Sequence, residues 1–262
     1  MIRGLYTAAT GMAAQQHQLD VTSNNIANVN TTSFKKDRSE FQDLMYESLN
    51  FSAGSTSEST RNPTGIDVGL GVRISGIQKD FLQGNLKETG NNFDISIQGK
   101  GFFKITLPSG DEAFTRNGAF KLNGDGALVN GSGYLLDPEI IIPDNLTDIS
   151  IAQDGTVTGL DPQTGATEAL GQITLSDFIN PSGLRPFGAS LYQETETSGT
   201  AIEGAPTTAA FGSLNQGMIE SSNVKLVNEM VELITAQRAY ESNSKAISTA
   251  DEMLDIVNRL KR

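Results

Sequence analysis

The sequence predicts an α+β fold in which N- and C-terminal helices form a coiled-coil-type assembly domain, with an inserted antiparallel β domain between them. Apolar residues recur at intervals of seven near both ends of the chain, which is typical of helices that pack along a coiled-coil seam. In the centre, apolar and polar residues alternate, and Asn-Gly or Asp-Gly pairs recur at short intervals. That pattern is typical of strands joined by hairpin turns. A chain that begins and ends in helices suits a subunit whose ends contact neighbouring subunits.

An N-terminal assembly helix is expected within residues 1–34. Its apolar repeat consists of Leu5, Met12, Leu19 and Ile26. The neighbouring positions of the same repeat are mostly small or polar, namely Ala8, Gln15, Thr22 and Val29. Because this apolar stripe is thin, a single partner helix would gain little from it, and we expect the helix to depend on further neighbours.

A C-terminal assembly helix is expected within residues 211–262, since neither proline nor glycine interrupts residues 221–262. Acidic residues lead this run and basic residues end it, an order that complements the helix dipole. The stretch LVNEMVELI is apolar on several faces, which indicates more than one packing neighbour. The apolar repeat consists of Leu226, Leu233, Tyr240, Ile247 and Leu254.

Residues 70–210 are expected to form the β domain. Phe93, Ile95 and Ile97 alternate with polar residues, which predicts a strand with one buried face. The run NGDG at residues 123–126 predicts a hairpin turn, and the calcium-loop alternative lacks the acidic residue at its twelfth position. Residues 35–69 are expected to connect the first helix to this domain. Their polar section, residues 48–65, is expected to form a loop or an extended arm.

Composition excludes several classes of protein. The net charge of −12 argues against a nucleic-acid partner, which needs a basic face. We interpret Lys35 and Lys36, a short basic cluster, as the solvated end of a helix. No apolar run approaches the roughly 20 residues that span a bilayer, so no membrane insertion is expected. Cysteine is absent, and the N-terminus lacks the apolar region of a secretory signal. The protein is therefore expected to stay in the cytoplasm or to leave it without a cleaved leader.

The sequence offers little catalytic chemistry. His17 is the one histidine, so a catalytic triad would have to use it. A metal site with several histidine ligands is excluded for the same reason. The short glycine pairs lack the spacing of a dinucleotide or phosphate loop. Acidic residues are scattered, and tryptophan is absent. We expect no catalytic residues, no cofactor and no metal, and keep a carbohydrate-binding β protein as an alternative.

The terminal segments resemble those of a known family. MIRGLYTAATGMAAQQHQLDVTSNNIANVNTTSFKKDRSEFQDLMYESL resembles the N-terminus of bacterial flagellar rod and hook proteins. LVNEMVELITAQRAYESNSKAISTADEML resembles the C-terminal helix of that family, and GNLKETGNNFDISIQGKGFFKI its central motif. The resemblance covers essentially the whole chain and is greatest to the distal-rod type. Ser33 departs from the pattern, because the family usually has glycine there, and we expect this turn to be held differently.

The resemblance implies a structural subunit, not an enzyme. Such a subunit polymerises helically into the distal rod, the drive shaft that links motor to hook, crosses the periplasm and surrounds the export channel. The implied partners are copies of the chain, proximal rod proteins, the hook protein, the P- and L-ring bushing and the flagellar export apparatus. The implied location is the flagellar basal body, reached without a cleaved signal peptide. A paralogous proximal rod protein is the alternative within the family.

Asparagines near the end of the first helix have two interpretations. Asn24, Asn25 and Asn28 can join the two apolar repeats in the assembly interface, because an amide both donates and accepts without bringing like charges together around a ring. Alternatively, Asn28 and Asn30 only terminate the helix, since asparagine tolerates the left-handed conformation.

In the arm, residues 48–65, Arg61 and Pro63 are the expected fixed points. Arg61 can form an ion pair with a neighbouring carboxylate, and Pro63 restricts the φ angle of the backbone.

Overall fold

The computed structural model describes residues 2–50, 55–57, 60–61, 65–143, 145–163, 165–208 and 211–260. The chain divides into two compact units. Unit 1 contains Met1–Ala27, Asp37–Lys79 and Lys225–Arg262, and unit 2 contains Asn28–Lys36 and Asp80–Val224. The predicted class is confirmed: terminal helices flank a central antiparallel β region.

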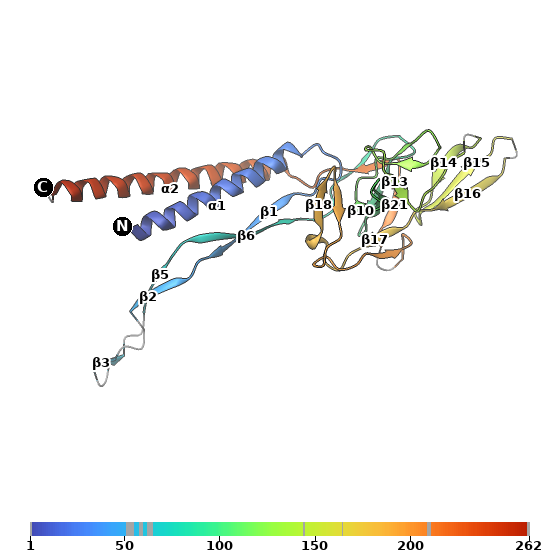
Figure 1. Ribbon diagram of the computed structural model, residues 1–262. Helices are drawn as coiled ribbons and strands as arrows, with labels where there is room; N and C mark the ends of the chain where they lie inside the picture. The colour runs from blue at the N-terminus through green and yellow to red at the C-terminus, as the bar shows by residue number, and fades with distance from the viewer. Residues whose placement is uncertain are drawn as a thin grey trace. The chain divides into compact units, whose positions relative to one another are not determined.

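Two long helices form one part of unit 1. Helix α1 spans Ile2–Ala27 and helix α2 spans Leu226–Leu260. They run antiparallel and pack against each other (Figure 1). Helix α2 begins at Leu226, and the earlier residues of the range 211–262 form two strands in unit 2 instead.

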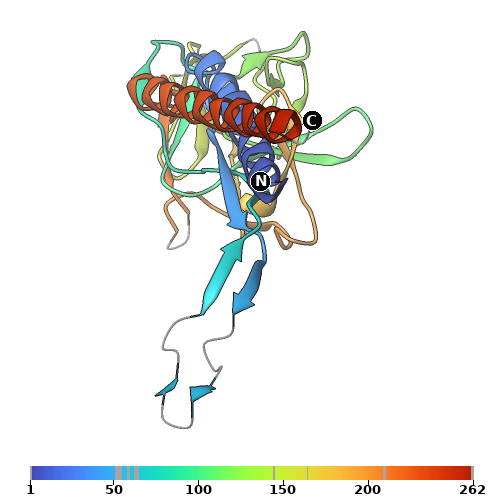
Figure 2. The ribbon, with the colours of Figure 1, turned by 90° about the vertical axis from the view of Figure 1, so that its left-hand side faces the viewer.

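The rest of unit 1 is a two-stranded antiparallel ribbon (Figure 2). Strand β1 pairs with β6, β2 with β5 and β3 with β4. The range 48–65, expected to be a polar loop or arm, therefore starts inside the paired strand β2, contains the β3–β4 pair and ends at the residue before β5. Strand pairing satisfies the backbone hydrogen-bonding groups of this polar segment. Pro63 lies outside the described residues, and Arg61 pairs through its backbone with Ser55. The strands are β1 (Asp37–Asp43), β2 (Tyr46–Asn50), β3 (Ser55–Ser57), β4 (Thr60–Arg61), β5 (Ile66–Gly69) and β6 (Val72–Lys79).

Unit 2 is built on an antiparallel sheet with the strand order β11-β12-β13-β9-β10-β19-β18. A further sheet has the order β14-β15-β16, and pairs β17-β20, β21-β8 and β22-β7 complete the unit. The elements are β7 (Leu86–Glu88), β8 (Ile95–Gln98), β9 (Phe103–Thr106), β10 (Glu112–Thr115), β11 (Lys121–Leu122), β12 (Leu128–Val129), β13 (Leu135–Asp137), β14 (Thr147–Ile151), β15 (Thr156–Leu160), β16 (Thr167–Gln172), β17 (Leu175–Asp177), the 3-10 helix η1 (Pro181–Gly183), β18 (Arg185–Gly188), β19 (Leu191–Gln193), β20 (Ile202–Gly204), β21 (Ser213–Gln216) and β22 (Met218–Glu220).

The hydrophobic core of unit 2 joins these sheets. Ile95 and Ile97 of β8 are fully buried among strand residues of the main sheet, as the alternation predicted. Ser96 is buried too, so β8 is covered on both faces and the expectation of a single buried face is wrong. The predicted turn after β11 is confirmed: the Asn123 side chain accepts hydrogen bonds from the backbone of Asp125 and Ala127.

A buried charge cluster lies beside this core. The Glu220 carboxylate pairs with Lys35 Nζ at 2.7 Å and with Arg116 Nε at 3.0 Å. It also accepts a hydrogen bond from the Gly84 backbone, while Lys35 donates to Leu82 O at 2.8 Å. The interpretation of Lys35 as a solvated helix end is therefore wrong, because its side chain is fully buried. Burying an unpaired ammonium would be prohibitive, and the carboxylate with the carbonyl makes it tolerable.

The pKa values of this cluster follow from burial and from charge. Burial, reinforced by the nearby Arg116 guanidinium, lowers the pKa of Lys35 to about 8, against the opposing attraction of Glu220. Burial alone would raise the pKa of Glu220, but the positive charges of Arg116 and Lys35 outweigh it and hold that pKa below its usual range.

Hydrogen bonds tie three segments together around the cluster. Asn223 accepts from the Lys36 backbone N–H at 2.8 Å, and its side-chain NH₂ donates to Asp80 O at 2.8 Å. The Ser33 backbone N–H donates to Glu220 O at 2.8 Å. The segments 33–36, 80–84 and 220–223 are thus joined within unit 2, although they lie far apart in the sequence. Each one adjoins a point where the chain passes to unit 1.

Ser33 shows how the turn manages without glycine. Its φ of 56° lies in the left-handed region, which costs a side-chain-bearing residue about 1 kcal/mol. Its buried hydroxyl donates to Arg116 O at 2.8 Å, a bond of comparable worth. The backbone therefore keeps a conformation that glycine would adopt freely, and the hydroxyl offsets the strain.

Replacing Glu220 by glutamine should destabilise unit 2 strongly. Lys35 and Arg116 would then lack their shared counter-charge in a buried site, and we expect a loss of about 3–5 kcal/mol in the free energy of unfolding. Urea unfolding followed by circular dichroism measures it. The control Glu40→Gln breaks the exposed pair with Arg38, where at most about 1 kcal/mol is expected. Equal losses in the two variants would contradict a central role for the cluster.

Lys35 should also make stability rise with pH. Its pKa of about 8 lies below the ordinary value of 10.5, so between these values the folded state holds fewer protons than the unfolded state. The free energy of unfolding should therefore increase by roughly 3 kcal/mol across this window. The readout is the difference between wild type and Lys35→Met, which lacks the titrating group. A difference that stays constant between those pH values would refute this assignment.

Candidate assembly surface

The α1–α2 pair is joined at one end by a buried amide. Asn25 Nδ2 donates to Glu229 Oε2 at 3.0 Å and to Asp37 O at 2.9 Å, and its Oδ1 accepts from the Asp37 backbone N–H at 2.9 Å. Asn25 and Glu229 are both about 2% exposed. One amide thus holds α1, α2 and β1 together. Its hydrogen bonds are made within the subunit, although the sequence had placed Asn25 in a contact with neighbours.

Further along, the two helices approach closely at a glycine. A Cβ atom on Gly11 would lie 2.7 Å from Asn243 Nδ2, which is closer than ordinary packing permits. The buried helix positions in this unit are mostly small or polar, and include Ala8, Thr22, Ala236 and Ala250. Val21 is the larger apolar residue among them. Small side chains allow the two backbones to approach, so the helix seam is built on positions beside the large apolar repeat.

The large residues of the predicted repeats lie at the edges of this seam. Two of them are exposed, Leu226 at 44% and Tyr240 at 39%. The others are half-buried: Leu5, Met12, Leu19, Ile26, Leu233, Ile247 and Leu254. Each therefore keeps surface that a neighbouring molecule can cover, and their role in an interface between subunits stays a prediction.

Helix α2 also carries an exposed apolar face near its start. Val227, Met230, Val231 and Ile234 are 73%, 51%, 55% and 48% exposed. Their spacing of three, four and seven places them on one side of the helix, and we call this set the α2 base face. The stretch LVNEMVELI was interpreted as having more than one packing neighbour, and this face is uncovered in the single chain.

The remaining asparagines behave differently from Asn25. Asn24 is exposed, and its amide lies 3.5 Å from an Asp37 carboxylate oxygen. Asn28 follows the last residue of α1, and its side-chain oxygen accepts from the Thr31 hydroxyl at 3.1 Å. Neither Asn28 nor Asn30 is among the described residues with a positive φ, so the left-handed helix end that the alternative expected is not formed.

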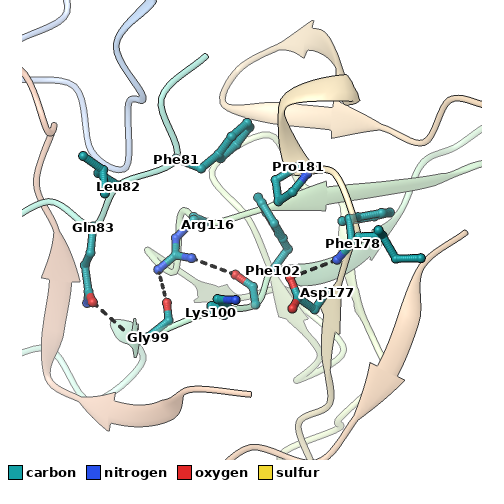
Figure 3. A pocket seen from close by; sticks show the side chains of 12 residues that line it. Phe81, Leu82, Gln83, Gly99, Lys100, Phe102, Arg116, Asp177, Phe178 and Pro181 are labelled. Atoms are coloured by element: carbon teal, nitrogen blue, oxygen red, sulfur yellow. Dashed lines mark hydrogen bonds between the residues drawn. The ribbon is translucent and has the colours of Figure 1, made fainter. Parts of the chain in front are cut away.

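A cavity of about 350 Å³ lies in unit 2 and is lined mainly by apolar residues, including Phe81, Phe102 and Phe178 (Figure 3). Three of its polar side chains make hydrogen bonds within the protein: Arg116 donates to Gly99 O and Gly101 O, Gln83 Oε1 accepts from the Gly99 N–H, and Asp177 Oδ1 accepts from the Phe178 N–H. His17 belongs to unit 1. Apart from these three side chains and Lys100, the lining is formed by hydrophobic residues and glycines.

Two other kinds of site were sought in the described part of the chain. No group of three or more His, Cys, Asp or Glu side chains converges there in a way that could hold a metal ion. Neither described helix combines the length and the hydropathy that crossing a membrane requires.

Family models match three separate parts of the chain. Residues 5–35 match the model described as "Flagella basal body rod protein". Residues 96–159 match "Flagellar hook protein FlgE/F/G D1 domain", and residues 215–260 match "Flagellar basal body rod FlgEFG protein C-terminal". The matched parts contain both helices and much of unit 2.

Curated relatives match along the whole chain. The flagellar basal-body rod protein FlgG of Borreliella burgdorferi is 46% identical, with 100% of each chain covered. FlgG of Caulobacter vibrioides is 48% identical, covering 99% of this chain and 100% of that one. FlgF of the same organism is 34% identical, with 99% and 98% covered. The resemblance found in the sequence is confirmed: the chain belongs to the flagellar basal-body rod protein family and is a structural subunit of that rod.

Proposed function

We propose that copies of this chain polymerise helically into the distal rod, the drive shaft from motor to hook, with the terminal helices lining an export channel. The observation that carries the proposal is the uncovered α2 base face together with the half-buried large residues of both repeats. Exposed apolar faces of this kind mark contacts with other protein surfaces. An elongated helix pair offers such contacts along its whole length.

We choose the distal over the proximal rod by comparing this chain with two paralogous rod proteins of one organism. Identity to the Caulobacter vibrioides FlgG chain is 48%, against 34% to its FlgF chain. We take the FlgG type as the distal member. Proximal rod proteins and the hook protein are then the neighbours at the two ends of the polymer, and the P- and L-rings surround it.

The proposal extends to how the chain reaches the rod and to whether it has an enzymatic activity. We propose that the chain reaches the rod through the flagellar export apparatus without a cleaved signal peptide. We also propose that it is not an enzyme and needs no cofactor, which the structural hydrogen bonds of Gln83, Arg116 and Asp177 at the unit 2 cavity support. The carbohydrate-binding alternative has no comparable support.

Leu233→Asp and Ile247→Asp should block polymerisation and leave unit 2 folded. Both side chains are half-buried at the edge of the helix seam, and burying an unpaired carboxylate costs several kcal/mol at every subunit contact. Sedimentation and negative-stain microscopy measure polymer, and circular dichroism reports the β structure. His17→Ala, an exposed change on α1, is the control. Normal polymers from the aspartate variants would show that α2 is not the assembly element.

Deleting residues 48–65 should permit assembly but give a softer or curved polymer. We propose that this arm contacts axially stacked subunits, with Arg61 and Pro63 as fixed points, and so opposes the sliding that bending requires. Curvature in electron micrographs is the readout. A Gly/Ser segment of the same length is the matched control and should also soften the shaft. Straight shafts of wild-type stiffness from both variants would make the arm a passive linker.

A further inference from the structure

The antiparallel α1–α2 pair keeps a constant register. Asn25 lies against Glu229, and Gly11 lies against Asn243. From Gly11 to Asn25 is fourteen residues along α1, and from Asn243 back to Glu229 is fourteen residues along α2. The two contacts therefore share one antiparallel register. Continued by nine more residues, this register places Ile2, the first described residue of α1, opposite residue 252 of α2.

Beyond this point α2 continues without a described partner from α1. Residues 253–260, which we call the α2 overhang, lie past the described part of α1. The seam positions show the change: Glu229, Ala236 and Ala250 are 2%, 3% and 9% exposed, whereas Val257, seven residues later, is 51% exposed. Met253 and Ile256 are also exposed, at 44% and 57%. Val257 thus continues the series of seam positions past the described part of α1, and Met253 and Ile256 add exposed apolar surface to the overhang.

The α2 base face is the other apolar surface on this helix. Between residues 241 and 252 the exposed side chains are polar apart from Ala246. Val227 and Ile256 are 29 residues apart, which is about 44 Å along a helix. One helix thus carries two separate apolar patches, one near each end.

We propose that the α2 overhang of one copy packs on the α2 base face of the next copy. This inference rests on the proposed self-polymerisation and names the surfaces it uses. The overhang extends an existing helix–helix seam, so a helix surface is the matching occupant. The base face has the three-and-four spacing that receives a helix. Because the two surfaces differ, the contact is heterologous and each copy keeps one surface free for the next, and repetition with a rotation that does not close a ring gives the open filament of the proposed function.

Disulfide trapping tests the contact, since the chain contains no cysteine of its own. The variant Val227→Cys/Ile256→Cys is allowed to polymerise and is then mildly oxidised. We expect a ladder of covalent oligomers on a non-reducing gel. Ser242→Cys/Ile256→Cys, with one cysteine in the polar middle of the helix, should give at least tenfold less ladder.

The other outcomes distinguish a failure of this inference from a failure of the proposed function. Polymers without a ladder, or equal ladders from both variants, would overturn the inference and leave polymerisation intact. A covalent dimer from Ile256→Cys alone would show that overhangs pair with each other, which also overturns it. A wild-type chain that never polymerises would overturn the proposed function and the inference together.

A second pair of variants covers the case in which cysteine prevents assembly. Ile256→Asp should raise the concentration needed for polymerisation at least tenfold. Thr249→Asp, at an exposed polar position of the same helix, should change it less than twofold. An unchanged threshold for Ile256→Asp would overturn the proposed contact.

Discussion

The carboxylate of Glu220 is the interaction on which the organisation of unit 2 depends. It lies at the end of β22, immediately before the segment that leads to α2, and it pairs with Lys35 and Arg116 from distant parts of the chain. Its buried charge can be accommodated only where both cations and the Gly84 N–H are in place. The cluster therefore requires segments from near both ends of the sequence to fold together.

This arrangement imposes a long-range constraint on the chain. Lys35 and Glu220 are separated by 185 residues, and Asn223 adds bonds to Lys36 and to Asp80. Buried ion pairs add less net stability than apolar packing of the same volume, but they tolerate few alternative arrangements. We interpret the cluster as a device that fixes which segments meet inside unit 2.

The helices of unit 1 are held together differently from unit 2, by close backbone approach and by one buried amide. Their buried positions are mostly small or polar, the helices approach closely at Gly11, and the Asn25 amide binds Glu229. This leaves the large apolar side chains at the edges and on the base face, where a monomer gains little from them. The apolar surface left exposed on these helices is therefore distinct from the surface that holds the two helices of one subunit together.

The sequence by itself determined the helix–β–helix order, the family and the positions that repeat every seven residues, because these depend on local periodicity. Only the tertiary structure decided which of those positions are buried. Ala236 and Ala250 lie in the seam while Leu226 stays exposed, since backbone approach favours small side chains. Lys35 looked solvated in a local reading, yet its counter-charge Glu220 lies 185 residues away. Residues 213–216 and 218–220 form strands rather than helix because they pair with β8 and β7, which lie more than a hundred residues earlier in the chain. A local sequence pattern does not show which distant residues pair, because the free energy of a buried ion pair or a strand pair depends on both partners.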